Sequence, residues 1–386
     1  MDGEQIGAPA SAGRKALLPA LALLVAAAVY ASLWPIEAPD LPRYLYPWLD
    51  HIRAAGRWRA FAEPFSNYTP AYLYLLALAA PLVGWISAMT AIKALSVGGT
   101  LWLAAAMRRL LLAARAVQPG RTALFVPLVP SVALNAALLG QCDALWSAPC
   151  LLAVAAAVEG RAAWTLAWWG LAFAIKVQAI FLGPFVAAFL IGRRAPIRLW
   201  LIPAAVYALV MVPAWLEGWP ALDLATIYLH QTGNFEFISM NAPNLWHLVQ
   251  QVPGSARLKL TPAAVTLAGA AVIAFIFFLR RAGRERLLET ALLSALIVPG
   301  LLPRMHDRYF FLADMLAFAV AAQRRDAVGR SFFLAVQMGS LGALAGYCTG
   351  IVPIVTLGAI VMIAATLALA ASFAPGANVP RAAAAA

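Results

Sequence analysis

Apolar stretches of about 20 residues recur along this chain from Leu17 onward, and no other feature constrains its fold as strongly. A helix of roughly 20 residues is long enough to cross the hydrocarbon core of a bilayer. Inside lipid, every backbone polar group needs a partner within the protein, so only helices and closed barrels can span a membrane. The segments of alternating polarity that barrel strands require are absent. The sequence therefore predicts an all-α integral membrane protein.

The charged residues are few and unevenly placed. They make up 11% of the 386 residues, against about a quarter in soluble domains. The net charge of +12 comes from short basic clusters between apolar stretches, a pattern typical of cytoplasmic loops beside anionic lipids. Without a basic stripe interleaved with aromatic residues, a nucleic-acid partner is excluded. Three cysteines without metal-ligand spacing predict neither a disulfide framework nor a metal site.

The basic pairs give a topology if each of them lies in the cytoplasm. They are Arg14-Lys15, Arg108-Arg109, Arg193-Arg194, Arg280-Arg281 and Arg324-Arg325. About 12 spans then follow, the first of them an uncleaved helix rather than a signal peptide, and both termini are cytoplasmic. The predicted spans are 16–34, 87–107, 122–139, one that returns to Glu159, two short ones that turn at Lys176, 197–215, 261–280, 287–302, 309–322, 332–347 and 351–373.

One apolar segment, 69–84, does not fit this alternation. Tyrosines crowd its beginning, and aromatic rings favour the membrane interface, so we expect an interfacial helix within the first external loop. The external loops are then 37–86 and 216–259. Residues 1–322 form the predicted catalytic membrane module, and residues 323–386 form scaffold helices and a short tail.

Polar residues outside the basic clusters gather on the external side of this topology. They include every histidine of the chain, and polar residues near a bilayer are by default functional. We therefore expect the working face to be external. The residues are Asp40, Asp50, His51, Glu63, Asp143, Glu217, Asp223, His230, Glu236, His247, His306 and Asp307.

Two aspartates stand at predicted helix ends. Asp40 follows the first span and could act as a general base for a bound hydroxyl, or it could cap the next helix. Asp143 could likewise be a functional carboxylate or an N-cap, and Gln141 beside it suits sugar hydroxyls.

Cationic residues supply candidate phosphate sites. Lys176, in a turn with Gln178, could hold a lipid phosphate or could simply extend its ammonium to the interface. The run from Arg304 to Arg308 places two arginines outside, which is an exception to the rule that basic residues lie in the cytoplasm. Such an exception requires negative charge nearby, from loop carboxylates or from an anionic substrate. The amides and aromatics of loop 217–259 would suit carbohydrate, a weak signal because polar loops generally contain them. No P-loop, nucleophile elbow, zinc-protease helix or dinucleotide fingerprint is present.

Four segments resemble the GT-C superfamily of integral-membrane glycosyltransferases, which use polyprenyl-phosphate-linked sugars. Within it, the pattern is similar to a bacterial mannosyltransferase-like branch related to the second mannosyltransferase of GPI-anchor synthesis. The segments are 40–52 (DLPRYLYPWLDHI), 67–76 (NYTPAYLYLL), 140–146 (GQCDALW) and 303–311 (PRMHDRYFF), with the turn 174–178 (AIKVQ) as a weaker fifth.

The resemblance implies a GT-C-like fold and a role for each matching residue. Asp40 would be the catalytic base of an inverting transfer of a sugar, such as mannose, from a polyprenyl-phosphate donor to a glycan, lipid or protein hydroxyl. The donor phosphate would be bound by Lys176, His306, Arg308 and Arg304. Sugar and acceptor would be bound by Asp143, Gln141, Gln178, Asp50, His51, Tyr68 and Asp307. No divalent metal would be required, and the site would face the periplasm or exterior of a bacterial inner membrane.

The sequence departs from the usual motifs in three places. It has Thr69-Pro70-Ala71 where a double proline is usual, and Val177 where the Lys-Pro-Gln turn has its proline. It also has Asp307 where Glu is common. None of these changes removes a charge, so they leave the mechanism intact and bear on the choice of sugar.

Two rival functions are open to a chain of this kind. A transporter or lipid flippase would share the many spans, but the sequence shows no charged residue in mid-span and no inverted repeat of broken helices. Another lipid-linked transferase, such as an O-antigen ligase or acyltransferase, would use a different donor.

Overall fold

The chain is built almost wholly from helices. The computed structural model describes residues 10–231, 237–252, 260–280 and 283–374, so Glu236, one of the polar residues predicted to be external, lies outside it. Within this part, the regular structure besides helices consists of two short strands, β1 (Ser239–Met240) and β2 (Met305–His306). The all-α class is therefore confirmed.

Five described helices are long and apolar enough to cross a membrane. They are α4 (Ala88–Ala113), α10 (Ile202–Glu217) with the short η7 (Ile197–Leu201) before it, α13 (Thr261–Leu279), α16 (Ala327–Thr349) and α17 (Val352–Ala371). The last two pack closely because glycines face each other: a Cβ on Gly342 would lie 3.2 Å from the Cα of Gly358.

The remaining helices of the bundle are shorter, bent or less apolar. They are α1 (Ala10–Leu33), α5 (Pro119–Ala123), η4 (Val126–Leu128), α6 (Pro130–Ala133), η5 (Leu134–Leu138), α7 (Asp143–Val158), α8 (Ala162–Ile175), η6 (Val177–Leu182), α9 (Gly183–Gly192), η8 (Arg284–Arg286), α14 (Leu287–Leu301) and α15 (Phe311–Arg324). The run from α5 to η5 bends by 54° at Pro130 and would make a sixth span if counted as one. The predicted spans coincide with these helices, but their predicted number, about 12, is not confirmed.

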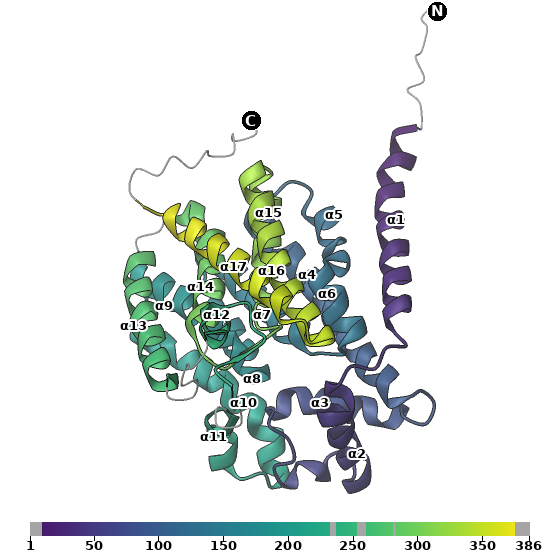
Figure 1. Cartoon of the computed structure of the whole chain (residues 1–386). Coiled ribbons are helices and arrows are strands. Elements are labelled where there is room, and N and C mark those ends of the chain that lie inside the picture. Colours follow the sequence, from purple (N-terminus) through teal and green to yellow (C-terminus); the bar gives the residue numbers. More distant parts are fainter. Residues whose placement is uncertain (1–9, 232–236, 253–259, 281–282, 375–386) are drawn as a thin grey trace, which may run out of the picture.

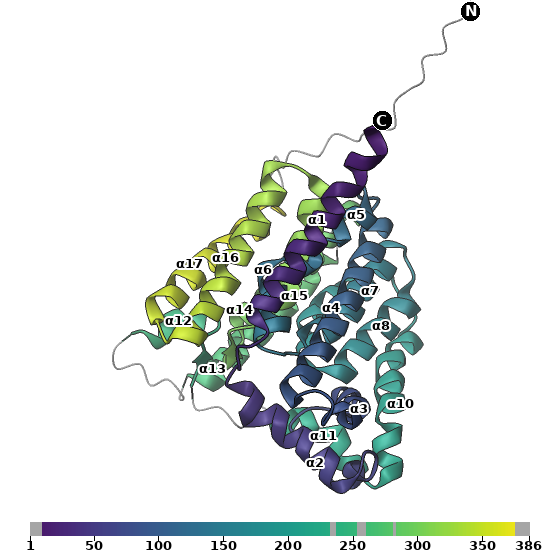
Figure 2. The ribbon, with the colours of Figure 1, turned by 90° about the vertical axis from the view of Figure 1, so that its right-hand side faces the viewer.

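A layer of short helices lies beyond one end of the bundle, as Figures 1 and 2 both show. This helical layer consists of η1 (Leu41–Leu45), α2 (Tyr46–Ala55), η2 (Arg59–Ala62), α3 (Pro70–Ala79), η3 (Ala80–Leu82) and α11 (Ala221–Gln231). Helix α3 covers most of the segment predicted to be interfacial. It is tied to the bundle by Thr69, whose hydroxyl donates to the carbonyl of Ala174 at 2.7 Å.

The opposite end of the bundle carries several of the basic clusters. Arg109 pairs with Glu159, which joins the ends of α4 and α7. Arg324 lies 2.9 Å from Glu289, so α15 and α14 meet there in the same way. These contacts bring clusters that are distant in sequence to one side, which we call the basic end.

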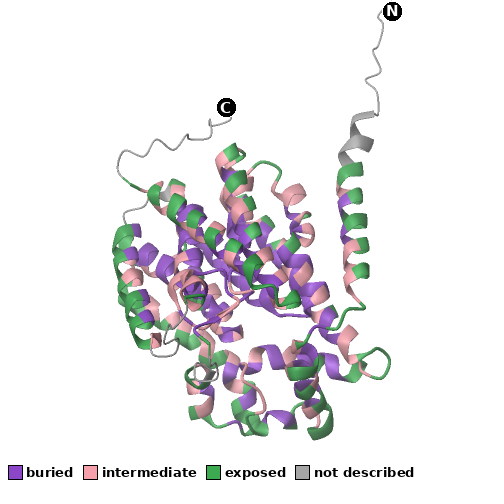
Figure 3. Ribbon diagram, viewed as in Figure 1, coloured by how far each residue is buried: buried purple, intermediate pink, exposed green. Residues whose placement is uncertain are grey.

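Burial follows the bundle. In Figure 3 the buried residues fill its middle, while the outward faces of α1 and α13 are exposed. Leu24 of α1 is 68% exposed and Leu209 of α10 is 71% exposed, as expected of side chains that contact lipid.

Two charged side chains inside helices were missed in the sequence. Lys93 in α4 donates to the carbonyls of Trp34 at 2.8 Å and Ile36 at 2.6 Å, just beyond the C-terminal end of α1. Asp314 in α15 is buried beside Ser131 and Ser340. Lys93 lies in the second turn of its helix and Asp314 in the first turn of its own, where apolar neighbours mask a single charge in any average of hydropathy.

Candidate functional site

Asp40 lies between the end of α1 and the helical layer. It immediately precedes η1, but its side chain makes no capping hydrogen bond there. Instead its Oδ2 accepts from Nε2 of Gln141 at 2.9 Å and lies 3.0 Å from Nη2 of Arg308. Its Oδ1 accepts from the hydroxyl of Tyr347 at 3.2 Å. Three segments distant in sequence therefore hold this carboxylate, and the capping alternative is not what the structure shows.

Asp143 and Lys176 form a buried ion pair. Lys176 Nζ lies 2.7 Å from Asp143 Oδ1, and their side chains are only 3% and 1% exposed. The same carboxylate accepts from Asn135 at 2.7 Å and from the indole of Trp146 at 2.8 Å. Asp143 makes no N-cap contact, and Lys176 does not reach the surface. Burial alone would lower the pKa of Lys176, but the Asp143 carboxylate raises it well above its usual value, so the ammonium stays charged.

Arg308 connects the two aspartates. Besides its contact with Asp40, its Nε lies 3.7 Å from Asp143 Oδ2, and its Nη1 lies 3.7 Å from Asp307 Oδ1. Its side chain is only 11% exposed. The site cluster, which we define as Asp40, Asp143, Lys176, Asp307 and Arg308, thus contains three carboxyl groups and two cations.

The two residues before Arg308 have displaced pKa values. Burial lowers the pKa of His306 to about 3, with Arg308 and Lys176 adding to the effect, so its imidazole is neutral near pH 7. It can donate or accept a hydrogen bond but does not add a third cation. Burial raises the pKa of Asp307 to about 6 against the opposing influence of Arg308. Asp307 therefore changes charge just below neutral pH.

The turn that presents these residues is held by the second predicted external loop. Strand β1 pairs in parallel with β2, and the backbone N–H of Arg304 donates to Ile238 at 2.6 Å. Asn244 donates to the carbonyls of Pro299 at 3.0 Å and Leu302 at 3.2 Å. It thereby supplies hydrogen bonds to backbone carbonyls at the C-terminal end of α14 that have no partner within the helix. Arg304 itself has a φ of 61°, a left-handed conformation that marks a tight reversal before Arg308.

The same loop uses its rings for anchoring. Helix α12 (Leu245–Gln250) packs against α17. Its His247 is buried and lies 3.2 Å from the hydroxyl of Thr356. Trp246 donates to the carbonyl of Leu301. These contacts anchor the loop to α14 and α17, whereas the sequence had only weakly indicated that its amides and aromatics bind carbohydrate.

Tyr68 and Gln178 border the cluster. Lys176 Nζ lies 5.3 Å from the ring centroid of Tyr68, a cation–π distance. Burial raises the pKa of Tyr68 to about 12, so its hydroxyl remains protonated. Gln178 is buried, with 3% of its surface exposed.

Two predicted site residues do not join the cluster. Asp50 has 68% of its side chain exposed and lies 3.6 Å from Arg53, one turn along α2. His51 stacks on Phe65 and contacts the carbonyl of Ala60 at 3.4 Å. Both belong to the helical layer, because α2 turns its other face, with Trp48 and Ile52, toward the interior.

Tyr347 and Asn135 are cluster contacts that the sequence analysis did not identify. Tyr347 lies in α16, within the segment that was assigned to scaffold, and its hydroxyl contacts Asp40. Asn135 is the one amide side chain in the second half of the bent helix pair, Pro130–Leu138, and that isolation is a signal that could have found it. Among the described residues, no three His, Cys, Asp or Glu side chains form a metal-binding group.

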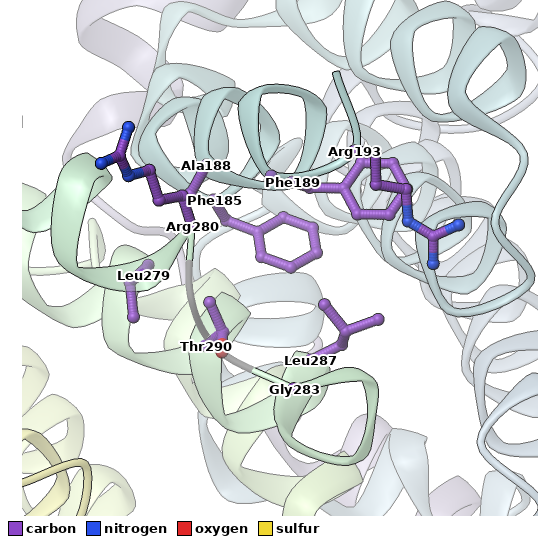
Figure 4. Close-up of a pocket in the computed structure, with 10 residues that line it drawn as sticks. Phe185, Ala188, Phe189, Arg193, Leu279, Arg280, Gly283, Leu287 and Thr290 are labelled. Atoms are coloured by element: carbon purple, nitrogen blue, oxygen red, sulfur yellow. The ribbon is translucent and has the colours of Figure 1, made fainter. Parts of the chain in front are cut away.

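A cavity of about 490 Å³ lies far from this cluster, at the basic end. Figure 4 shows the rings of Phe185 and Phe189 facing it from α9, with Leu279 and Leu287 opposite. Since the site cluster lies at the other end of the bundle, we assign the cavity no part in it.

Comparison with known proteins supports the fold. No family model matches the chain, and no curated protein matches it. Among solved structures, the chain is similar to the crystal structure of ArnT from Cupriavidus metallidurans bound to undecaprenyl phosphate. The TM-score is 0.52 at 15% sequence identity, and the alignment covers 92% of this chain and 77% of that chain. At this identity the likeness shows the fold alone: the chain has an ArnT-like, multi-pass membrane fold.

Proposed function

We propose that this protein is an inverting glycosyltransferase that takes a sugar from a polyprenyl-phosphate donor. The observation that carries the proposal is the site cluster, in which Asp40, Asp143, Lys176 and Arg308 converge from four distant segments. The ArnT structure of similar fold is bound to undecaprenyl phosphate, a lipid of the expected donor class. A buried group of charges at one end of an apolar bundle suits a substrate with a polar head and a lipid tail.

The donor phosphate would be bound by Arg308 and Lys176, with Arg304 and the neutral imidazole of His306 as further hydrogen-bond donors. In the structure, Nη2 of Arg308 lies 3.0 Å from Oδ2 of Asp40, so this guanidinium already has a carboxylate partner. A donor phosphate competes for the same guanidinium, and its arrival would loosen Arg308 from Asp40. The carboxylate would then be available to the acceptor.

In the transfer itself, Asp40 accepts the proton of the acceptor hydroxyl while that oxygen forms a bond to C1 of the sugar. The bond from C1 to the phosphate oxygen breaks on the opposite face, and the electron pair leaves with the polyprenyl phosphate. One displacement inverts the anomeric centre. Arg308 and Lys176 stabilise the charge that develops on the departing oxygen, in a site that excludes most water. Gln141, Asp143, Gln178, Tyr68 and Asp307 remain to position sugar and acceptor.

The proposed orientation follows from the two ends of the bundle. Cytoplasmic loops are enriched in Lys and Arg, so the basic end would be cytoplasmic, together with both termini. The site cluster would then face the periplasm or exterior of a bacterial inner membrane. A hexose such as mannose is the proposed sugar, on the resemblance to the mannosyltransferase-like branch.

Incubating purified protein with radiolabelled polyprenyl-phosphate sugars and a membrane extract would test the proposal. We expect transfer from one donor to a glycan, lipid or protein, unchanged in EDTA because a phosphate leaving group needs no metal here. Loss of turnover in EDTA would overturn the metal-free mechanism. Folded protein that releases no sugar from any donor would contradict the proposed function and direct attention to transport.

Tyr347→Phe tests the residue from α16. Its hydroxyl donates to Asp40, and a hydrogen bond to a charged group contributes about 1.5–3 kcal/mol. At the lower end of that range we expect kcat to fall about tenfold, with little change in the KM for the donor. The matched control is Tyr207→Phe, whose hydroxyl donates to the carbonyl of Leu224 away from the cluster. Equal effects of the two substitutions would deny Tyr347 a positioning role.

Because the pKa of Asp307 is raised, we expect donor binding to depend on pH. Its pKa of about 6 means that it is neutral below this pH, when two carboxylates balance two cations, and ionised above it. The donor phosphodiester remains a monoanion throughout. We therefore expect the donor KM to rise, up to about tenfold, as pH increases through 6. Asp307→Asn should abolish this step and Asp50→Asn should preserve it; a step that survives in Asp307→Asn would assign it to another group.

A further inference from the structure

Four exposed arginines lie on the helical layer, at the end where basic residues are not expected. We call Arg43, Arg53, Arg57 and Arg59 the arginine surface. They belong to η1, α2, the turn after α2, and η2. Between residues 41 and 63 the carboxylates are Asp50 and Glu63, so this stretch has a net charge of +2 without histidine. Cationic loops outside the cytoplasm break the usual pattern and call for an anionic partner.

The fold fixes this surface by packing its other side. Trp48 and Ile52 of α2 and Phe61 of η2 are buried, and these elements contact α3 and α10. Gly56 ends α2 with a φ of 92°, a conformation that favours glycine and reverses the chain. The arginines therefore stand on the exposed side of an amphipathic layer whose apolar side belongs to the core.

A second observation places this layer at a bilayer surface. The tip between η3 and α4 exposes Trp85 by 91%, with Leu82 at 52% and Ile86 at 37%. Trp58, between two of the arginines in sequence, is 42% exposed. Exposed tryptophan with neighbouring aliphatic side chains is typical of the membrane interface, where the ring meets both lipid and water. Such residues would be a liability on a surface that faced only water.

We propose that the arginine surface binds the phosphate headgroups of anionic phospholipids in the leaflet that faces the site cluster. Guanidinium groups suit phosphate because their planar donors match its oxygens and because they shed water readily. Tryptophan at Trp58 and Trp85 supplies the apolar part of the same contact. Arg43 lies three residues after Asp40, so lipid bound here would also hold η1 beside the cluster. The proposal concerns lipid contact and needs no turnover, so it stands or falls independently of the proposed reaction.

The alternative occupant is a soluble anionic glycan that comes to the site as acceptor. Such a glycan would contact the same arginines but would have no contact with the exposed tip at Trp85. Because that tip exposes apolar side chains, which a soluble glycan would leave in water, it favours the bilayer as the occupant. The two occupants are separated by the experiment below.

Quenching of Trp58 by brominated lipids in nanodiscs tests the proposal. Full-length protein is placed in phosphatidylcholine discs that contain equal small fractions of brominated phosphatidylglycerol or brominated phosphatidylcholine, and the Trp58 signal is obtained by difference from Trp58→Phe. An arginine near an anionic surface strengthens attraction about fivefold, so we expect several-fold stronger quenching by the anionic lipid. Arg57→Gln with Arg59→Gln should equalise the two lipids.

Two further variants keep the result interpretable. Arg57→Lys with Arg59→Lys should retain most of the preference, which separates loss of charge from loss of fold. Arg198→Gln, which removes an exposed arginine from η7 at the basic end, should leave it unchanged. Equal quenching by both lipids in the parent protein would overturn the proposal. So would a Trp58 response that appears only when a soluble anionic oligosaccharide is added, which would assign the surface to an acceptor.

Discussion

Asp40→Asn is expected to lower the rate of sugar transfer by about a thousandfold while leaving the protein folded. General-base catalysis contributes about 10²–10⁴-fold, and an amide cannot accept the acceptor proton. The geometry supports retention of the fold, because an asparagine Oδ1 could still accept from the Tyr347 hydroxyl or from Gln141. Transfer would be measured with the donor identified in the panel assay, under single-turnover conditions so that product release does not mask the chemical step.

Two aspartate controls sharpen this result. Asp50→Asn changes an exposed carboxylate of the same helical layer and should keep near-normal transfer. Asp307→Asn changes another of the carboxyl groups next to Arg308 and should mainly alter the pH dependence of donor binding. Near-normal turnover in Asp40→Asn, together with a thousandfold loss in Asp307→Asn, would transfer the role of base to Asp307.

The sequence singled out residues that the structure brings together, but it did not predict the contacts among them. Asp40, Asp143, Lys176 and Arg308 were each singled out as charges beside apolar spans, and the resemblance to the GT-C superfamily then implied their roles. From the local sequence alone, Asp40 and Asp143 could have been helix caps and Lys176 an interface residue, since local sequence does not reveal what lies across a bundle. Only the fold shows that Arg308 reaches both aspartates and that Asp143 is compensated by Lys176.

The misses have a common physical origin. Tyr347, Lys93 and Asp314 are polar side chains with mostly apolar neighbours in their helices, and those neighbours dominate the periodicity and the mean hydropathy. The number of spans remained unsettled because short helices such as α8 and α9 are apolar but fall below the length of a full crossing. Short helices of this kind depend on neighbours for their burial, and a linear sequence does not name those neighbours.

Lys176→Met should be the most destabilising of the substitutions considered. Removing one partner of a buried ion pair leaves the other charge uncompensated, at a cost of about 3–5 kcal/mol. Arg308, 3.7 Å from Asp143, would offset part of this, so we expect a loss near 3 kcal/mol and a fall in Tm of roughly 4 °C for a chain of this length. Unfolding can be followed with a thiol-reactive dye on the buried Cys142 and Cys150, after Cys348→Ser removes the exposed thiol.

The double substitution distinguishes an ion pair from mere packing. Asp143→Asn with Lys176→Met removes both charges. If the pair acts through its charges, the double variant should be more stable than Lys176→Met alone. If the two side chains only fill space, the losses of stability of the two single variants should add. Arg109→Gln is the matched control at the basic end, because that pair is 41% and 27% exposed and contributes at most about 1 kcal/mol. A double variant less stable than either single one would mean that Asp143 is stabilised mainly by Asn135, Trp146 and Arg308. In that case Lys176 would be free to bind the donor phosphate without first giving up a structural partner.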